Sequence, residues 1–476
     1  MRPVPIRMPG RLFTALATGG GGAEALDLLA RAEYSRRLAC AHAVTEAARE
    51  IGGGVAEAAG QAWELLAAAH RADPRAVSAV LTHPSAGTAL VGLLARLDRV
   101  VEGGAGAVGE PPVRWFSSLA ASAAVRAGVS ARVRWPLTTD QVFLPSLGGA
   151  RFSGAGPGDL AEVAIDAAGA ARVDVAGRGS VPGPVAVPKA PYTSSGRWRA
   201  AHRLAVLDTG APLLLDDVDP LRFPGVPERP LGLTADDLHW WEVTAREACR
   251  LLRDHHPGTF AELAAGPRTL VPLGRTGGFS GSSAEAFGSM ALSRPRTGRA
   301  LALSLAHELQ HSKFAAVLHL FDLFEPGGEE RYYAPWRPDP RPLLGLFHGA
   351  YAHLGVAQFW NRHRDVEQDP EELARAHAQF ARWRAGAREA TEVLLSSGRL
   401  TALGQDFAET MLRTLDALCR LPVPAEAGRR GLALAAEHRV EWVRRNDREA
   451  VPESSRYGLW SAASHVGTTG FEPATP

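Results

Sequence analysis

The pattern of apolar and polar residues divides the chain into stretches of different texture. Residues 1–110 carry Ala and Leu at helical spacing, as in EALDLLARAEYSRRLACAHAVTEAAREI, and predict a helical region. Residues 111–297 change to short β-compatible runs separated by Gly, Pro and Asp, such as RLAVLDTGAPLLLDD, and predict a mixed α/β region with short strands. Residues 298–448 return to helical spacing. The expected fold class is therefore α+β and mostly helical, with a strand-rich middle region.

Local signals refine this outline. The last helical region predicts helices over about 298–324, 342–362, 371–397, 402–420 and 425–444. LTADDLHWWEVTAREACRLLRDHH predicts an amphipathic helix capped by Thr234 or Asp236, followed by a strand in TLVPLG. FSGSSAEAFGSMALSRP predicts a loop and then an edge strand near residues 286–292, which could pair with an extended substrate. The polar, turn-rich residues 449–476 predict a disordered tail.

The GGGG run at residues 19–22 lacks the preceding strand and the spacing of a phosphate-binding loop. We therefore interpret it as a flexible turn before a helix. No phosphate site is expected there.

Composition limits the classes of function. A chain of 476 residues is longer than one core usually grows, so two or three packed subregions are expected. A net charge of +1 indicates neither nucleic acid nor an anionic membrane as the main partner. The oligomeric state stays open. The N-terminus lacks an uninterrupted apolar stretch of the signal-peptide kind, and Cys40, Cys249 and Cys419 are odd in number and far apart. We expect a cytoplasmic protein with buried free thiols.

The strongest chemical signal is HELQH, inside the apolar stretch LSLAHELQHSKF at residues 303–314. Residues four apart on a helix lie about 40° apart on one face. His307 and His311 can therefore direct their imidazoles at one metal ion, which is the chemistry of the HExxH pattern. Glu308 lies beside that direction, and in a zinc hydrolase it would be the general base that deprotonates a metal-bound water.

The segment PLLGLFHGAYAHLGVAQFW offers two candidates for a third ligand. His348 shares its stripe with small residues, on which another helix can approach closely, and it is the favoured ligand. His353 is the alternative, because the two lie about 140° apart on a helix and are not expected to serve one ion equally. The carboxylates Glu325, Glu329 and Glu330 lie in a stretch that predicts an exposed, solvated turn.

Other polar residues have ordinary interpretations. His255 and His256 fall at a predicted helix end, where the helix dipole favours histidine. Ser280, Ser282 and Ser283 in GFSGSS do not have nucleophile-elbow spacing and predict a flexible loop. His319 lies off the face of the HELQH pair and is interpreted as a packed or surface residue.

Together, AHELQHSKF and YYAPWRPDPRPLLGLFHGAYAHLGVAQFW resemble the HExxH-type peptide-modification proteins found beside ribosomally made peptide precursors, described as α-ketoglutarate-dependent peptide β-hydroxylases. The resemblance is best over about residues 278–363, and LPSLG and LLLDDVDPLR fit more loosely. It implies a zincin-like HExxH helix in the helical C-terminal half. It also implies Fe(II) held by His307, His311 and a third residue, with α-ketoglutarate and O2 as cosubstrates and a precursor peptide as substrate. The usual oxygenase triad is two histidines and a carboxylate, so a three-histidine site departs from that pattern.

The far carboxylate of such a cosubstrate needs a cation. Lys313, Arg337 and Arg341 are the candidates. Two alternatives remain open on the residues alone. One is a zinc metallopeptidase with Glu308 as general base, and the other is a peptide-binding scaffold with a structural metal.

Overall fold

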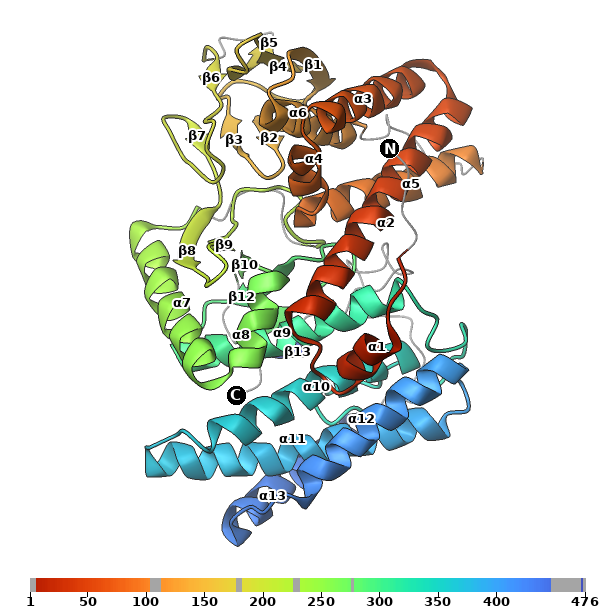
Figure 1. Cartoon of the computed structure of the whole chain (residues 1–476), viewed down its shortest axis with the longest axis vertical. Coiled ribbons are helices and arrows are strands. Elements are labelled where there is room, and N and C mark those ends of the chain that lie inside the picture. The colour runs from red at the N-terminus through yellow and green to blue at the C-terminus, as the bar shows by residue number, and fades with distance from the viewer. Residues whose placement is uncertain are drawn as a thin grey trace.

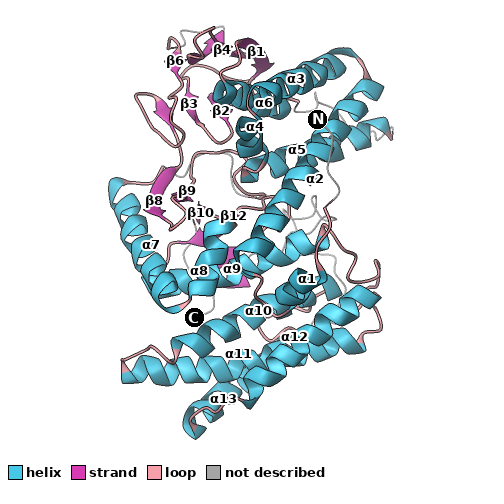
Figure 2. Ribbon diagram, in the orientation of Figure 1, coloured by secondary structure: helices cyan, strands magenta, loops and turns pink. Residues whose placement is uncertain are grey.

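A computed structural model describes residues 6–102, 113–176, 182–225, 232–274, 278–446 and 472–473. It confirms a mostly helical α+β fold with the strands in the middle of the chain. The helices of the C-terminal part form one end of the molecule, and the smaller sheets lie at the other end (Figures 1 and 2).

The N-terminal part is helical as predicted. Its helices are α1 (Gly10–Ala17), α2 (Gly22–Ile51), α3 (Gly53–Ala72), α4 (Pro74–Leu81), α5 (Pro84–Val101) and α6 (Arg114–Ala127). The GGGG run forms the turn between α1 and α2, where Gly19, Gly21 and Gly22 all have positive φ, a conformation that side chains other than glycine rarely adopt. Among the described helices, none alone is long and apolar enough to cross a bilayer, and α4 with α5 passes that test only as a pair bent by 73°.

The middle region contains three sheets. Their strands are β1 (Ala131–Pro136), β2 (Gln141–Leu144), β3 (Gly148–Arg151), β4 (Leu160–Ile165), β5 (Ala171–Ala176), β6 (Val185–Ala186), β7 (Trp198–Arg199), β8 (His202–Val206), β9 (Pro212–Leu215), β10 (Thr269–Leu273), β11 (Phe279–Gly281) and β12 (Ser289–Ser293). Two sheets have the strand orders β1-β4-β5-β6 and β2-β3-β7. The third has the order β13-β11-β12-β10-β9-β8, where β13 (Glu472–Pro473) comes from the end of the chain.

The predicted edge strand is not at an edge. β12 pairs in parallel with β10 on one side and antiparallel with β11 on the other, and all five of its residues are buried. Strands covered in this way belong to the interior of a sheet. The expectation of an edge near residues 286–292 is therefore wrong. The neighbour on that side is β11, and the other side of β11 pairs antiparallel with β13 (Glu472–Pro473), the outermost strand.

Two helices lie between β9 and β10, of which the sequence predicted the first. They are α7 (Ala235–His255) and α8 (Pro257–Ala265). The hydroxyl of Thr234 accepts a hydrogen bond from the backbone N–H of Asp237, and the carboxylate of Asp237 accepts one from the backbone N–H of Thr234. The predicted cap at Thr234 is therefore confirmed, in the form of a capping box.

The C-terminal part contains five long helices: α9 (Gly298–Leu318), α10 (Leu343–His363), α11 (Pro370–Ser396), α12 (Ala402–Arg420) and α13 (Ala425–Asn446). Four of them match the predicted ranges closely. α9 ends earlier than predicted, because the chain turns after Leu318 and Phe324 bridges to Leu400 ahead of α12. The predicted tail lies outside the described residues apart from 472–473.

The largest hydrophobic core joins distant parts of the chain. It combines Leu12, Leu16 and Leu26 of α1 and α2 with Leu309 of α9 and Phe347 of α10. A second core lies among α2 to α6, and a third lies between α6 and the small sheets. α2 therefore contributes to two cores, and α1 is attached to the helices that carry the HELQH motif.

Candidate metal centre

The HELQH motif lies on α9, a helix that is buried on almost every side. From Leu305 to Val317 every residue is buried, with α7, α10 and the β11–β12 edge around it. The hydroxyl of Thr297 accepts from the backbone N–H of Ala300 and caps the start of the helix. A helix surrounded in this way holds its side chains in fixed positions, which is what a metal centre requires.

The two motif histidines meet as the spacing predicted. Their Nε2 atoms are 3.1 Å apart, and both rings are buried. Two nitrogens at that separation, each about 2.1 Å from a common ion, subtend about 95° at the ion, so the pair fits two ligands of one metal. The same distance also allows one imidazole N–H to donate to the other ring when no ion is bound.

α10 places one histidine against each histidine of α9. The ring centres of His353 and His307 are 5.1 Å apart, and those of His348 and His311 are 5.8 Å apart. The structure therefore brings both predicted candidates to the motif, on different sides of it. Nδ1 of His353 lies 2.9 Å from the carbonyl oxygen of Gly349, a contact that fixes the ring, so that a metal ion would have to bind at Nε2.

Glu308 is fully buried beside this pair. Its Oε1 lies 3.9 Å from Nε2 of His307, and its Oε2 accepts a hydrogen bond of 2.7 Å from the hydroxyl of Ser282. Among the described residues Oε1 has no hydrogen-bond partner. Ser282 directly follows β11, so the sheet edge positions the carboxylate. The sequence interpretation of Ser282 as part of a flexible loop missed this contact, because only the fold brings residues 282 and 308 together.

Two glycines of α10 make room for the wall of the site. A Cβ on Gly349 would lie 2.3 Å from the ring of Trp336, and a Cβ on Gly345 would lie 3.0 Å from Nε of Arg341. Trp336 in turn stacks on His353, with ring centres 4.4 Å apart. Arg341 therefore lies over α10 one turn before His348.

The two predicted arginines share one carboxylate. Arg337 and Arg341 both donate to Asp339, at 2.9 Å and 3.1 Å, and the side chain of Asp339 is 44% exposed. An exposed partner of this kind contributes little stability, so the guanidiniums can exchange it for another anion.

Lys313 has a different role from the predicted one. It is fully buried, and its ammonium donates to the carbonyl oxygens of Gly19 and Gly20 and to Oε2 of Glu262, at 2.9, 3.0 and 2.8 Å. These three acceptors use all three of its N–H groups. Glu262 also accepts from the backbone N–H of Gly22. Lys313 therefore fastens the GGGG turn to α9, and we do not retain it as an anchor for a cosubstrate.

Two other sequence candidates, His256 and His319, have structural partners. His256 stacks on Phe359, with ring centres 4.2 Å apart, and Nδ1 of His319 lies 2.5 Å from Glu33. All three cysteines are free, as expected; Cys249 is buried, whereas Cys40 and Cys419 are only half-buried.

Within the described part of the chain, one compact trio of metal-ligand side chains has all its ligand atoms within 4.8 Å of one another, and it is elsewhere: His83, Asp216 and Asp219. Around HELQH the histidine pair is close, but the α10 histidines stand further off. No protein-family model matches the chain, and no curated protein sequence matches it. The function must therefore be argued from the residues and their geometry.

Proposed function

We propose that the protein is an Fe(II)- and α-ketoglutarate-dependent hydroxylase that acts on the β-carbon of a residue in a ribosomally made precursor peptide. The observation that carries the proposal is the buried pair of imidazoles 3.1 Å apart, faced by two further histidines from α10. Imidazole ligands suit iron, and oxygenases need a centre with several open positions. The resemblance of the HELQH and PWRPDPRPLLGLFHGAYAH segments supports the choice of reaction.

The proposed ligands are His307, His311 and His348, with His353 as the alternative third ligand. His353 competes because its Nδ1 is already engaged by a backbone carbonyl, the usual arrangement of a ligating histidine. The metal content of the His348→Ala and His353→Ala variants separates them, because only loss of a true ligand lowers metal affinity strongly.

Bound iron together with α-ketoglutarate would supply the O2-dependent oxidation of a C–H bond. The residues of the chain then bind, orient and exclude water. Three histidines would bring no negative charge as ligands, so a dianionic cosubstrate would supply the charge that a ligating carboxylate supplies in the usual triad. Arg341 is the best placed cation for its far carboxylate, because it lies over α10 one turn from His348 and its present partner is exposed.

Glu308 and Ser282 form the side of the site nearest the sheet. Oε2 of Glu308 is held by the Ser282 hydroxyl, and Oε1 lies on the side of His307. A carboxylate fixed in this way can accept a hydrogen bond from a water or a substrate amide at the centre. In this proposal Glu308 positions the peptide.

The peptide itself would run along β11. This strand is antiparallel to β12, and its other side already pairs with the backbone of residues 472–473. Such pairing supports the idea that β11 accepts an extended chain by strand addition. Because Ser282 directly follows β11, a strand in that position would pass close to Glu308.

The test is turnover of a candidate precursor peptide, taken from the reading frames next to the gene. With Fe(II), α-ketoglutarate and O2, mass spectrometry should show a product heavier by one oxygen. The His307→Ala variant should give none, whereas Glu329→Gln, which changes an exposed carboxylate, should match the wild type. Peptide cleavage, or oxygen insertion that does not depend on α-ketoglutarate, would count against the proposal.

One observation favours a second candidate, a zinc metallopeptidase. The Glu308 carboxylate lies next to the histidine pair, with Oε1 3.9 Å from Nε2 of His307, as a general base on a metal-bound water would require. In that case zinc would support cleavage without α-ketoglutarate, and Glu308→Gln would abolish it while the metal stays bound. The same incubation, repeated with zinc and without the keto acid, distinguishes the two reactions.

A further inference from the structure

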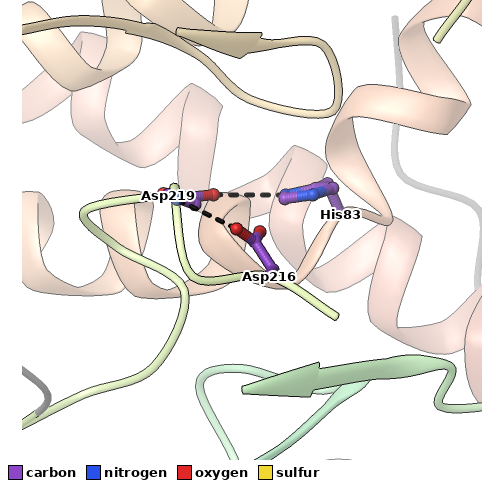
Figure 3. Close-up of side chains that lie close together, drawn as sticks. All are labelled: His83, Asp216 and Asp219. Carbon is purple, nitrogen blue, oxygen red and sulfur yellow. Dashed lines mark hydrogen bonds and ion pairs between the residues drawn. The ribbon is translucent and has the colours of Figure 1, made fainter. Parts of the chain in front are cut away.

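A second group of possible metal ligands lies away from HELQH in the chain. His83 precedes α5, and Asp216 and Asp219 lie in the loop after β9 (Figure 3). All three side chains are buried, and their ligand atoms lie within 4.8 Å of one another. Because residue 83 and residues 216–219 are far apart in the sequence, only the tertiary structure brings them together.

The loop is built so that each aspartate uses one oxygen for the backbone. Oδ1 of Asp216 accepts from the N–H groups of Val218 and Asp219, both at 3.0 Å. Oδ1 of Asp219 accepts from the N–H of Leu221 at 2.8 Å. These bonds fix the directions of both carboxylates without using all their acceptor positions.

The second oxygen of Asp219 points into the group. Asp219 is 0% exposed, its Oδ2 lies 3.7 Å from Nδ1 of His83, and that oxygen forms no hydrogen bond of regular geometry with the described residues, although the side chain of Ser85 lies close enough to act against the raised pKa of Asp219 (Figure 3). A buried carboxylate oxygen without a regular hydrogen bond is costly unless something else, such as a cation, satisfies it.

Neighbouring groups hold the imidazole of His83 in place beside Asp219. Its Nδ1 lies 2.7 Å from the hydroxyl of Ser85, and Arg37 donates to the backbone oxygen of His83 at 3.0 Å. Burial, and then the positive charge of Arg37, lower the pKa of His83 to about 3.

The charges of the group are unbalanced. Burial, and then the neighbouring Asp216, raise the pKa of Asp219 to about 8. The pKa of Asp216 is raised as well, mainly by burial, while Arg222 acts against both shifts. Arg222 faces three buried carboxylates, Asp216, Asp217 and Asp219, so a cation bound among them would offset part of their negative charge.

We propose that His83, Asp216 and Asp219 bind a divalent cation, separate from the HELQH centre. One imidazole and two carboxylates suit a first-row ion such as Mn²⁺ or Zn²⁺. The ion fastens the start of α5 to the 216–219 loop. The same loop contributes Asp217 and Val218 to the wall of a cavity of about 690 Å³, so the ion stabilises that wall.

The test compares full-length wild type with Asp219→Asn and with the control Asp217→Asn, which removes a carboxylate from the same loop but outside the group. Each protein is stripped with chelator, loaded with Mn²⁺ or Zn²⁺, dialysed and analysed for bound metal. A His307→Ala/His311→Ala variant reports this site without the HELQH centre. We expect one equivalent in that double variant, one fewer in Asp219→Asn than in the wild type, and no loss in Asp217→Asn.

Asparagine resembles a protonated aspartate in shape, so the variant also tests the competing arrangement. If a proton completes the balance, Asp219→Asn will retain both the wild-type metal content and the wild-type melting temperature, and the proposal is overturned. If Asp219→Asn does not fold, His83→Gln replaces it with the same expected loss. The proposal is also overturned if chelator treatment leaves the melting temperature of the His307→Ala/His311→Ala variant unchanged.

Discussion

Replacing Lys313 with Met should destabilise the protein without weakening the binding of α-ketoglutarate, the proposed cosubstrate. The change shortens the side chain by one atom and removes a fully buried ammonium that has three acceptors. Its partner Glu262 is also buried and would lose its hydrogen bond from the ammonium. Burial lowers the pKa of Lys313, and Glu262 acts against that shift. The charged form of Lys313 is therefore stabilised by its contact with Glu262.

The size of the effect follows from the geometry. The two charged atoms are 2.8 Å apart, which at an effective dielectric constant of about 20 corresponds to an attraction of about 6 kcal/mol. Desolvation offsets part of this, and removing one partner of a buried pair costs about 3–5 kcal/mol. The double variant Lys313→Met/Glu262→Gln should recover about half of that loss, because glutamine has no charge to leave unpaired and can still accept from Gly22.

The assay is equilibrium unfolding in urea, followed by tryptophan fluorescence, for the wild type, the two single variants and the double variant. The coupling between the two positions is then read from the double-mutant cycle. In parallel, the KM for α-ketoglutarate is measured for Lys313→Met. Stability within about 1 kcal/mol of the wild type, or a KM raised tenfold with an unchanged unfolding midpoint, would refute a purely structural Lys313.

Three further predictions follow from single contacts. Gly349→Ala should lower the free energy of unfolding by about 1–3 kcal/mol through overpacking and should lower the amount of bound metal, because its Cβ would lie 2.3 Å from the ring of Trp336. The control is Gly92→Ala, whose Cβ would have nothing within 4 Å. Equal melting temperatures for the two variants would contradict the prediction. Ser282→Ala should lower turnover by roughly 10- to 100-fold with the metal retained, because Glu308 loses its 2.7 Å donor, and unchanged kcat would show that this bond does not position the carboxylate. Burial alone would raise the pKa of Glu33, but its hydrogen bond to a histidine and the nearby arginines lower it to about 2. The ionised carboxylate therefore stabilises the fold above about pH 4.5, and this stabilisation is lost as the pH falls through about 2. Relative to Glu33→Gln, the wild type should therefore lose about 3 kcal/mol of its free energy of unfolding over that pH window. A difference in urea midpoint between the two proteins that does not change with pH would contradict this prediction.

Much of the secondary structure could be predicted because its causes are local. The helical spacing after residue 298 locates α10 to α13 within a few residues, and Thr234 is recognisable as a cap because a helix start is decided by neighbouring residues. The spacing of His307 and His311 also determines that the two rings share a face, and their Nε2 atoms do meet.

Errors arose where a distant segment supplied the deciding contact. β12 has the texture of a strand, but only its pairing with β10 and β11 shows that it is interior. The sequence around Ser282 indicates an ordinary loop serine, and only the tertiary structure shows its hydrogen bond to Glu308. Lys313 stands out as one of two lysines, yet its partners come from residues 19, 20 and 262.

The sequence by itself determined the elements and the histidine pair, because backbone periodicity and capping act over only a few residues. The tertiary structure alone decided which side chains share one buried space, since that depends on how elements far apart in the chain pack together. For this reason His83 lies beside Asp216 and Asp219, and His353 and His348 each lie near one histidine of the HELQH pair. The chemistry at both places depends on charge and burial, which no local pattern records.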